Sequence, residues 1–476
     1  MTKSSVALIV DVGGQSIRGV LLTPELNVLE KISYPCTTLS KPNGFIEHQP
    51  AELRQTFSQV IKKSMDRARG LACQVTALGL TVQRSSFVCV DRITGLALSP
   101  VLSWQDTRAA ADLAHAKIDR TMIWQHSGLI CNAHYGASKM LWCQNHYPWV
   151  GRAKTQSRLV FLPLAGYLTL QLSELKRFVI DPSIAARTLL FNIDSLAWDD
   201  LLMNAFDIDR HCLPEVLSHD QVIPLRTRFG TMEKTWVMGD QNAAFFARPH
   251  ALQSASRVML NLGTGGFLVR PMAAHRTQLA TRPGLLTTLL IAAPKPRYAL
   301  EATINGVASA LAWFQDQYQL DSIKPYHPLA ALECDNLFFN SIGGLGAPFW
   351  QAQIKPRFNR AADVDAMLKA VYESILFLVK LNFDLMNHDA CVEGIDLSGG
   401  MAQDQAFNQA IADLCQVPLV YNTQYEATAV GAARLLFNQF DQVGRKDSLE
   451  FFPNNNTQLL QRYHQWREFV DMILNE

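Results

Sequence analysis

The sequence predicts an α/β fold with a duplicated core, and three observations support this. Apolar runs typical of strands alternate with segments of helical period. A strand, a glycine-rich turn and a second strand open the chain, and a similar pattern recurs half a chain later. The length of 476 residues suits two or three domains. We therefore expect two domains, 1–249 and 250–476, although two unrelated hairpins with glycine turns remain an alternative.

The composition excludes several classes of protein. Lys and Arg number 43 against 42 Asp and Glu, so the basic excess typical of nucleic-acid binding is absent. The nine cysteines are scattered without a Cys-x-x-Cys pair, which disfavours a structural zinc site and a secreted disulfide framework. The sequence has no signal pattern and no apolar run of membrane-spanning length. We expect a soluble, cytoplasmic protein without nucleic-acid or membrane partners, and a homodimer is left open.

The first half begins with a predicted hairpin, 6–10 and 18–22, around Asp11–Ser16. Glycines in such a turn would supply positive φ. A helical pattern over 50–67, strands over 77–80 and 87–90, and a helix within 123–145 follow.

The second half repeats the pattern, with strands 257–262 and 267–270 around Gly263–Gly266. Leu368, Val371, Ile375 and Leu378 mark one face of a helix. Another strand ends at Ser398-Gly-Gly400 and precedes a helix with Phe407, Ala410, Ile411 and Leu414 on one face. An amphipathic helix over 459–474 closes the chain, after a polar linker, 453–457.

Three glycine turns could hold phosphate: Asp11–Ser16, Gly263–Gly266 and Gly399–Gly400. Glycine lets the main chain approach an anion, and turn amides and hydroxyls can donate to phosphate oxygens. The first turn is not a P-loop, because Val20 stands where that motif needs Lys. A single turn of this kind usually has no ligand, but three in one chain favour a nucleotide site.

Asp240 follows Gly239 where a helix is expected to begin. Its structural interpretation is a helix N-cap. Its functional interpretation is a general base that accepts the proton of a hydroxyl attacking phosphorus. The residue pattern alone favours the cap, although the two roles are compatible.

Polar residues gather after two predicted strands, in Gln83-Arg84-Ser85 and in Ser103-Trp104-Gln105-Asp106-Thr107-Arg108. The ends of strands in α/β sheets are where ligands bind. Arg and Asp side chains can hold sugar hydroxyls while Trp covers the carbon face, but a surface ion pair and a core Trp are the simpler interpretation. The sequence contains no His-x-x-x-His and no Gly-x-Ser-x-Gly motif.

Taken together, these motifs resemble the FGGY carbohydrate kinases, most of all the glycerol kinase branch. The resemblance covers nearly the whole chain, in order. It rests on Asp11-x-Gly-Gly-x-Ser-x-Arg18, Gly44–Pro50, Gln83-Arg84, Trp104, Gly239–Ala244, Gly263-Thr-Gly265, Glu301–Trp313, Gly343–Trp350, Ser398-Gly-Gly400 and Glu426–Ala433.

The resemblance implies two domains of the actin/hexokinase-like ATPase fold, with a cleft that closes on ATP, Mg²⁺ and a small sugar or polyol. The first domain would carry the acceptor site and first phosphate motif, and the second would bind the nucleotide. Asp240 is then implied as the general base, and Asp11 and Asp240 as the carboxylates near Mg²⁺. The implied nucleotide residues are Asp11, Gly13, Gly14, Gln15, Ser16, Arg18, Gly263, Thr264, Gly265, Gly399, Gly400 and Asp404. The implied acceptor residues are Arg84, Ser85, Trp104, His134, Asp240 and Gln241.

The sequence also departs from the glycerol kinase pattern. Ser85 stands where those enzymes have Glu, and His134 is the best match to a Tyr that contacts the substrate. Asp106-x-Arg108 is closer to the pentulose kinases of the family. On the nucleotide side, Ala308, Ala312 and Asp404 replace a Gly, a Gln and an Asn.

The resemblance therefore predicts a kinase that transfers phosphate from ATP to a hydroxyl of a small sugar or polyol, with a pentulose kinase as the alternative. A catalytically weak ligand-binding sensor is a competing hypothesis, motivated by the substitutions near the nucleotide. An ATPase like Hsp70 or actin ranks lowest, because it has no use for an acceptor site with Arg84 and Trp104.

Overall fold

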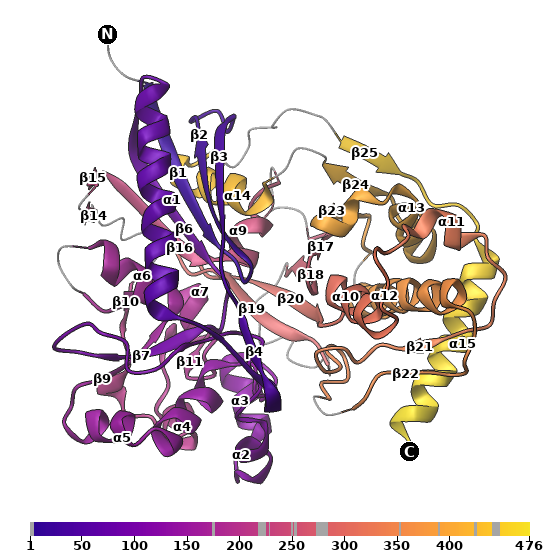
Figure 1. The fold of residues 1–476 in the computed structure, drawn as a ribbon, viewed down its shortest axis with the longest axis horizontal. Helices are drawn as coiled ribbons and strands as arrows, with labels where there is room; N and C mark the ends of the chain where they lie inside the picture. The colour runs from indigo at the N-terminus through magenta and orange to yellow at the C-terminus, as the bar shows by residue number, and fades with distance from the viewer. Residues whose placement is uncertain are drawn as a thin grey trace. The chain divides into compact units, whose positions relative to one another are not determined.

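The computed structural model divides into two compact units (Figure 1). It describes residues 4–173, 177–217, 225–227, 229–248, 251, 255–272, 284–351, 354–388, 391–422, 426–439 and 448–476. Unit 1 comprises Met1–Leu252, Thr288–Tyr298 and Glu426–Gly444, and unit 2 comprises Gln253–Thr287, Ala299–Tyr425 and Arg445–Glu476. The predicted domain boundary between Pro249 and His250 lies outside the described residues and stays a prediction.

The central sheet of unit 1 has five strands in the order β16-β6-β1-β2-β3. β1 forms an antiparallel hairpin with β2 and runs parallel to β6, which in turn runs parallel to β16. The last seven residues of β1 are buried, as expected for a strand covered on both faces. The bounds are β1 Ser4–Val12, β2 Ser16–Leu22, β3 Val28–Pro35, β6 Cys73–Val82 and β16 Lys234–Gly239.

A second five-stranded sheet in unit 1 has the order β4-β5-β8-β7-β9. Its strands are β4 Leu39–Lys41, β5 Phe45–His48, β7 Phe87–Asp91, β8 Val101–Leu102 and β9 Leu159–Pro163. Two-stranded sheets are formed by β10 (Val179–Ile180) with β13 (Glu215–Val216), β11 (Phe191–Asn192) with β12 (Ala197–Trp198), and β14 (Leu225–Thr227) with β15 (Gly230–Met232). The helices of this unit are α1 Pro50–Gly70, α2 Ala110–His115, α3 Arg120–Ser127, α4 Gly136–His146, α5 Pro148–Thr155, α6 Leu164–Leu172, α7 Pro182–Ala185, α8 Asp200–Ala205, α9 Asp240–Phe245 and α14 Ala427–Phe437.

Glycines allow two helices to pack closely on the central sheet. A Cβ at Gly19 would lie 2.4 Å from Ser64 Oγ of α1, and one at Gly79 would lie 3.3 Å from Leu436 of α14. A Cβ at Gly431 would lie 1.8 Å from a main-chain carbonyl oxygen of α9, so α14 also crosses α9 at close range. These contacts hold α9 in place, and Asp240 is the first residue of this helix.

Unit 2 repeats the strand arrangement of unit 1. Its sheet order is β19-β20-β18-β17-β23-β24-β25, in which β17 and β18 form an antiparallel hairpin and β17, β23 and β24 are parallel. The series β24-β23-β17-β18-β20 thus matches β16-β6-β1-β2-β3, which confirms the predicted duplicated α/β core. The strands are β17 Arg257–Leu262, β18 Gly266–Pro271, β19 Leu286–Ile291, β20 Arg297–Ile304, β21 Phe338–Phe339, β22 Arg357–Phe358, β23 Gly394–Ser398, β24 Leu419–Asn422 and β25 Ser448–Phe451.

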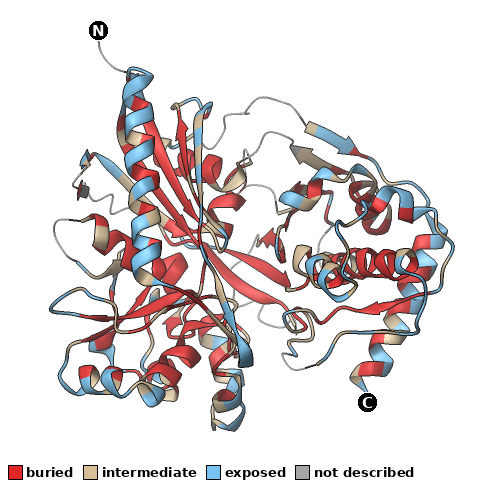
Figure 2. Ribbon diagram, viewed as in Figure 1, coloured by how far each residue is buried: buried red, intermediate tan, exposed pale blue. Residues whose placement is uncertain are grey.

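Helices α12 and α15 define much of the core of unit 2. α12 is buried over most of its 24 residues (Figure 2), and all four predicted face residues belong to the unit's hydrophobic core. The predicted C-terminal helix is confirmed, with one face buried around Tyr463 and Trp466. The helix bounds are α10 Ala308–Gln317, α11 Tyr326–Ala330, α12 Val364–Asn387, α13 Gln405–Cys415 and α15 Thr457–Leu474.

The predicted reason for the turn glycines is wrong in both hairpins. Gly13, Gly14, Gly263 and Gly265 do not have positive φ, whereas Gly399 does, at 101°. Glycine is needed at position 265 because the main chain is tightly packed there: a Cβ would lie 3.0 Å from Ile304 O. These turns span three residues between the strands, so they are not the two-residue turns that the positive-φ argument assumed.

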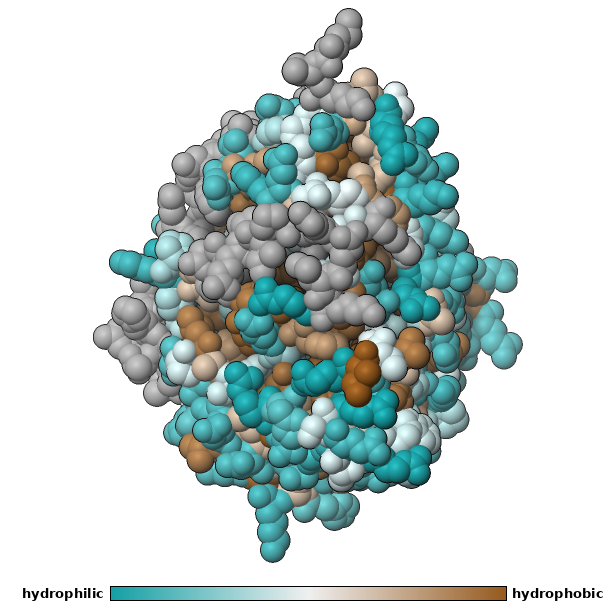
Figure 3. Space-filling model, turned by 90° about the vertical axis from the view of Figure 1, so that its left-hand side faces the viewer, coloured by the Kyte–Doolittle hydropathy of each residue, from teal (hydrophilic) through white to brown (hydrophobic). Residues whose placement is uncertain are grey.

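The exposed surface is mixed in character. The face in Figure 3 shows hydrophobic residues singly or in small groups among hydrophilic ones. Of the described residues, no helix combines the length and the apolar character needed to cross a bilayer.

Candidate functional site

Asp11, Arg84 and Asp240 lie at one edge of the central sheet of unit 1. β1, β6 and β16 are parallel, so their carboxyl ends meet at the same edge. In register, Asp11 lies beside Thr81, and Gly239 lies beside Val82. Asp11, Arg84 and Asp240 therefore come together because each stands at or just after the end of a neighbouring strand.

Asp11 is buried, and both of its carboxylate oxygens accept hydrogen bonds. Oδ1 accepts from Thr81 Oγ1 at 2.9 Å, and Oδ2 accepts from Arg18 across the hairpin. A carboxylate oxygen has further lone pairs, so Asp11 could still accept hydrogen bonds from waters around a cation.

Arg18 joins two carboxylates. Besides Asp11, its Nη1 donates to Glu426 at 3.3 Å, and Lys31 pairs with the other oxygen of Glu426. Burial opposes the charge on Arg18, but the attraction of both carboxylates leaves its pKa above the ordinary value. Its Nε is buried and has no partner in the structure, so this cation has a donor left for a ligand oxygen.

The turn of the first hairpin is held by its carbonyl groups. Gly13 N donates to Ser16 O at 3.0 Å, Thr38 Oγ1 donates to Gly14 O, and Cys36 N donates to Gln15 O at 2.8 Å. Engaging these carbonyls reduces their repulsion toward a bound anion.

Asp240 is the first residue of α9, and the predicted N-cap role is wrong by one position. Gly239 is the N-cap residue, and Asp240 Oδ1 accepts from its neighbour Gln241 N at 2.7 Å, not from an amide of the next turn within the described residues. Burial and the nearby Asp11 raise the pKa of Asp240 to about 6, while Arg84 acts in the opposite direction. The side chain keeps about 24% exposure, so it can still be reached. Such a pKa suits a group that takes up a proton near neutral pH.

Arg84 is buried and lies across Gly239. Its Nε is 4.0 Å from Asp240 Oδ1, and its Nη1 donates to Asn242 Oδ1 at 3.5 Å. A Cβ at Gly239 would lie 2.7 Å from the Arg84 side chain, so glycine makes this approach possible. Asn242 is itself held by Leu289 O at 2.8 Å. This chain of contacts keeps the Arg84 guanidinium beside the Asp240 carboxylate.

Ser85 has a left-handed main chain, with φ of 65°. Its Oγ donates to Arg187 O at 3.3 Å, and its carbonyl accepts from Lys139 Nζ at 3.2 Å. Lys139 is fully buried and also donates to Ser103 O at 2.7 Å. One lysine of α4 thus ties together both loops that carry the predicted acceptor residues.

Trp104 and His134 meet through the main chain. His134 Nδ1 lies 3.1 Å from Trp104 O, and Trp104 N donates to Ser86 Oγ at 2.8 Å. Gln241, the last predicted acceptor residue, is buried, and its Nε2 lies 3.5 Å from Asp240 Oδ2. The acceptor roles of all these residues stay predictions.

The Asp106-x-Arg108 pair, which is similar to pentulose kinases, has a structural role. Both side chains are fully buried, and Arg108 bonds to both oxygens of Asp106 and to Glu47 at 2.7 Å. Asp106 Oδ2 also accepts from Ile46 N at 2.7 Å. The pair holds the loop after β8 in place, so its presence does not help to identify the acceptor.

In unit 2, the second hairpin turn meets the start of α10. Ala308 N donates to Gly263 O at 3.2 Å, and both the amide and the hydroxyl of Ser309 donate to Thr264 O. Thr264 itself is exposed. Ala312 is exposed one turn further along α10. The turn is thus anchored through its carbonyls, which leaves the Thr264 side chain accessible.

The third glycine turn follows β23, directly beside the second. A Cβ at Gly399 would lie 2.3 Å from Leu262 O, whereas one at Gly400 would meet nothing within 4 Å. Ser398 Oγ is buried without a partner. Asp404 caps α13 by accepting from Phe407 N at 3.1 Å, and its other oxygen accepts from Tyr326 N at 2.7 Å. Asp404 therefore has a clear structural function, and its nucleotide role stays a prediction.

Four residues that support these sites were given no role from the sequence: Thr81, Lys139, Asn242 and Glu426. Each lies next to a residue that was singled out, through strand register, helix packing or the return of α14 to unit 1. The available signals were a lysine and an asparagine, each next to apolar residues within a predicted helix, because a buried polar side chain needs a partner.

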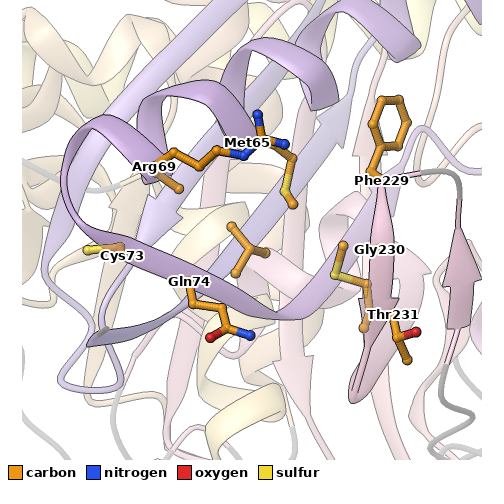
Figure 4. A pocket seen from close by; sticks show the side chains of 10 residues that line it. Met65, Arg69, Cys73, Gln74, Phe229, Gly230 and Thr231 are labelled. Atoms are coloured by element: carbon orange, nitrogen blue, oxygen red, sulfur yellow. The ribbon is translucent and has the colours of Figure 1, made fainter. Parts of the chain in front are cut away.

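A cavity of about 360 Å³ lies elsewhere in unit 1 (Figure 4). It is lined by the end of α1, by Cys73–Val75 at the start of β6 and by Phe229–Met232. β6 has ten residues, so about 30 Å separates this cavity from Asp11 and Arg84 at the other end of the strand. None of the predicted site residues lines it.

Comparison with known proteins agrees with the arrangement of both units. The sequence profile of the FGGY family of carbohydrate kinases, N-terminal domain, matches residues 6–244, and that of the C-terminal domain matches 258–439. A glycerol kinase of Azotobacter vinelandii is 29% identical, over 89% of this chain and 87% of its own, and one of Pasteurella multocida is 26% identical, over 100% and 99%.

Solved structures show the same fold. Glycerol kinase of Plasmodium falciparum with ADP has a TM-score of 0.85 at 22% identity, covering 100% of this chain and 99% of its own. Xylulose kinase of Lactobacillus acidophilus has a TM-score of 0.83 at 18% identity, covering 99% and 98%. The family profiles span most of both units, and the chain therefore belongs to the FGGY family of carbohydrate kinases, which are ATP-dependent enzymes.

Proposed function

We propose that this enzyme transfers the terminal phosphoryl group of ATP to a hydroxyl of a small polyol or sugar, with Asp240 as general base. One observation carries the proposal: an accessible carboxylate with a raised pKa stands beside a buried arginine, where three parallel strands end. The glycerol kinases named above, similar to this chain over nearly its whole length, support a small polyol as acceptor.

In this proposal Asp240 accepts the proton of the attacking hydroxyl, and Arg84 keeps the carboxylate in place. The pKa of about 6 leaves Asp240 ionised at neutral pH yet basic enough to take up a proton. Arg84 and Gln241 would donate to the acceptor's oxygens, and Trp104 would cover its carbons. Exclusion of water from these groups would prevent hydrolysis of ATP.

The residues present fit a divalent cation. Asp11 and Asp240 lie close enough for Asp11 to raise the pKa of Asp240, and a cation between two carboxylates would relieve that repulsion. Because both oxygens of Asp11 already accept hydrogen bonds, contact through water suits them better than direct ligation. When bound, Mg²⁺ would neutralise charge on the phosphate oxygens.

The residues present also fit the phosphates of ATP. Arg18 has an unpartnered, buried Nε, Thr264 is exposed at its turn, and Gly400 leaves open space. Gly263, Gly265 and Gly399 would let main chain approach the nucleotide. No observation favours a pentulose over a polyol, since the Asp106–Arg108 pair is fully engaged within the protein.

The test is Asp240→Asn. It should keep ADP binding and lose roughly 10²- to 10⁴-fold in kcat, because only the base is removed. ADP release is measured with glycerol, erythritol, xylitol, dihydroxyacetone and xylulose as acceptors. Asp66→Asn, an exposed carboxylate on α1, serves as the control and should keep wild-type turnover.

Two results would contradict the proposal. Near wild-type turnover of Asp240→Asn would remove Asp240 from the mechanism. Ligand binding by the wild-type protein without turnover of any acceptor would favour the sensor hypothesis instead.

A further inference from the structure

The ring of His134 is fixed in one tautomer by its contact with the Trp104 loop. Its Nδ1 lies 3.1 Å from Trp104 O. A carbonyl oxygen can only accept, so whichever ring nitrogen faces it must carry the proton. This holds for either orientation of the ring. In a neutral imidazole the other nitrogen then has a lone pair and can only accept a hydrogen bond.

The surroundings keep this imidazole neutral. Burial lowers the pKa of His134 to about 4, and the nearby charge of Lys139 lowers it further. The Trp104 carbonyl and Asp106 act in the opposite direction. The effect of Asp106 is offset, because Arg108 bonds to both of its oxygens. No salt bridge to His134 is formed within the described part of the chain.

The second ring nitrogen is available to a ligand. Among the described residues, the polar contacts of His134 are those to Trp104 O and Asn132. The free nitrogen is not one of the buried polar atoms that lack a partner, and the residue is only half-buried. Water or a bound molecule can therefore reach this nitrogen and donate a hydrogen bond to it.

We propose that His134 makes the acceptor site selective for a molecule that presents a hydroxyl, and not a carbonyl, to its free nitrogen. This inference rests on the function proposed above and narrows its substrate class to polyols, or to sugars with a hydroxyl at that carbon. A hydroxyl can donate a hydrogen bond to the lone pair of this nitrogen. A ketone oxygen has no proton to donate, so its lone pair and that of the nitrogen repel each other. A tyrosine at this position would accept both groups, because its hydroxyl can donate and accept.

Asp240 imposes the same requirement at the reacting end. Its carboxylate also only accepts, so the transferred group must be a hydroxyl. The substrate must therefore offer two donors, one to Asp240 and one to His134. Ser85 cannot relax the second requirement, since its own hydroxyl donates to Arg187 O.

The experiment compares matched acceptors that differ at one carbon. kcat/KM is measured by ADP release for glycerol, erythritol and xylitol, for their single-deoxy analogues and for the corresponding ketones. The same series is run with His134→Phe and His134→Gln, after thermal melting confirms that each variant folds. The hydroxyl that contacts residue 134 is the one whose removal costs the wild-type enzyme but not His134→Phe.

At that carbon, we expect the ketone to be used roughly 10- to 100-fold less well than the alcohol by the wild-type enzyme. His134→Gln should reduce this ratio several-fold, because an amide nitrogen can donate to a ketone. Equal use of alcohol and ketone by the wild-type enzyme would overturn the inference while leaving the proposed function intact. Turnover of no acceptor would overturn both.

A second measurement tests the tautomer directly, and the signals absent from His134→Phe identify His134 among the twelve histidines. ¹⁵N NMR of the imidazole rings distinguishes a protonated nitrogen from one with a lone pair. For His134 at pH 7 we expect a neutral ring that keeps its proton on the nitrogen facing Trp104 O. A doubly protonated ring, or the opposite tautomer, would overturn the inference.

Discussion

Replacing Lys139 tests how the loops that contain Ser85 and Ser103 are held in place. Lys139 is fully buried, and its Nζ donates to Ser85 O and Ser103 O. Burial lowers its pKa from the ordinary 10.5 to about 7, with Arg108 acting in the same direction and Asp106 and Cys143 opposing it. The perturbation is Lys139→Met, which keeps the length of the side chain and removes its titration.

The direction in which stability changes with pH follows from the number of protons that the folded and unfolded states bind. Between pH 7 and 10.5 the unfolded chain holds the lysine proton and the folded protein does not, so protonation favours unfolding. The free energy of unfolding therefore rises with pH across this window. Below pH 7 the folded protein has not gained this extra stability. The full difference of 3.5 pH units corresponds to about 5 kcal/mol. Between pH 7 and 9.5 the change amounts to about 3 kcal/mol.

The assay is urea unfolding of wild type and variant from pH 7 to 9.5, followed by a probe in unit 1. Subtracting the two curves cancels the contribution of titrating groups that do not interact with Lys139. The loss of two hydrogen bonds to buried carbonyls shifts the variant by a constant of about 1–3 kcal/mol for each carbonyl. Lys139→Gln, which can still donate to a carbonyl, should differ in that constant but show the same pH dependence.

A difference between wild type and Lys139→Met that stays flat from pH 7 to 9.5 would refute the reasoning. It would mean that the folded protein keeps the lysine charged throughout, with a partner that compensates for its burial. If the Met and Gln variants share the same pH dependence but differ in the constant, the effect of the lysine charge is separated from that of its hydrogen bonds.

Three further predictions concern the sheet edge, helix packing and the nucleotide side. kcat/KM should rise with pH through about 6 as Asp240 ionises, and Asp11→Asn should move this limb to lower pH by removing a like charge, as the pH profile would show. Gly431→Ala should destabilise unit 1 by roughly 3 kcal/mol or more in urea unfolding, whereas Gly70→Ala, whose Cβ meets nothing within 4 Å, should change it little. Asp404→Ala should cost about 1–2 kcal/mol by uncapping α13, and Asp404→Asn much less, both measured by unfolding alongside ADP affinity.

Local pattern was enough to predict the two hairpins and several of the longer helices. Alternation of apolar runs and helical faces located both hairpins, α1, α12 and α15, because each of these buries one continuous set of side chains. The duplication was also visible, since both halves place glycines at equivalent turns. What the sequence did not reveal is the return of α14 to unit 1, because no local signal encodes which sheet a helix covers.

The site was predictable in kind but not in its contacts. The resemblance named Asp240 and Arg84 together, and the structure explains their proximity through the shared edge of β6 and β16. It could not reveal Lys139 as the link between two loops, since that depends on where α4 packs. Nor could the resemblance reveal that Asp106 and Arg108 form a buried ion pair within the protein.

Ser85 stands where the glycerol kinase pattern has Glu, and this difference affects the charge balance around Asp240. A second carboxylate beside Arg84 would compete for its guanidinium and would add to the repulsion that Asp11 already exerts on Asp240. With Ser85 uncharged and turned toward Arg187 O, Arg84 faces Asp240 without that competitor, and the pKa of Asp240 stays near 6. In the proposed function, Ser85 therefore lacks a carboxylate that could accept from the acceptor's hydroxyls, while Asp240 keeps the raised pKa that suits a base. In the proposed function, the effect of Ser85 is on acceptor recognition, and the inference for His134 places an accepting nitrogen on the neighbouring loop.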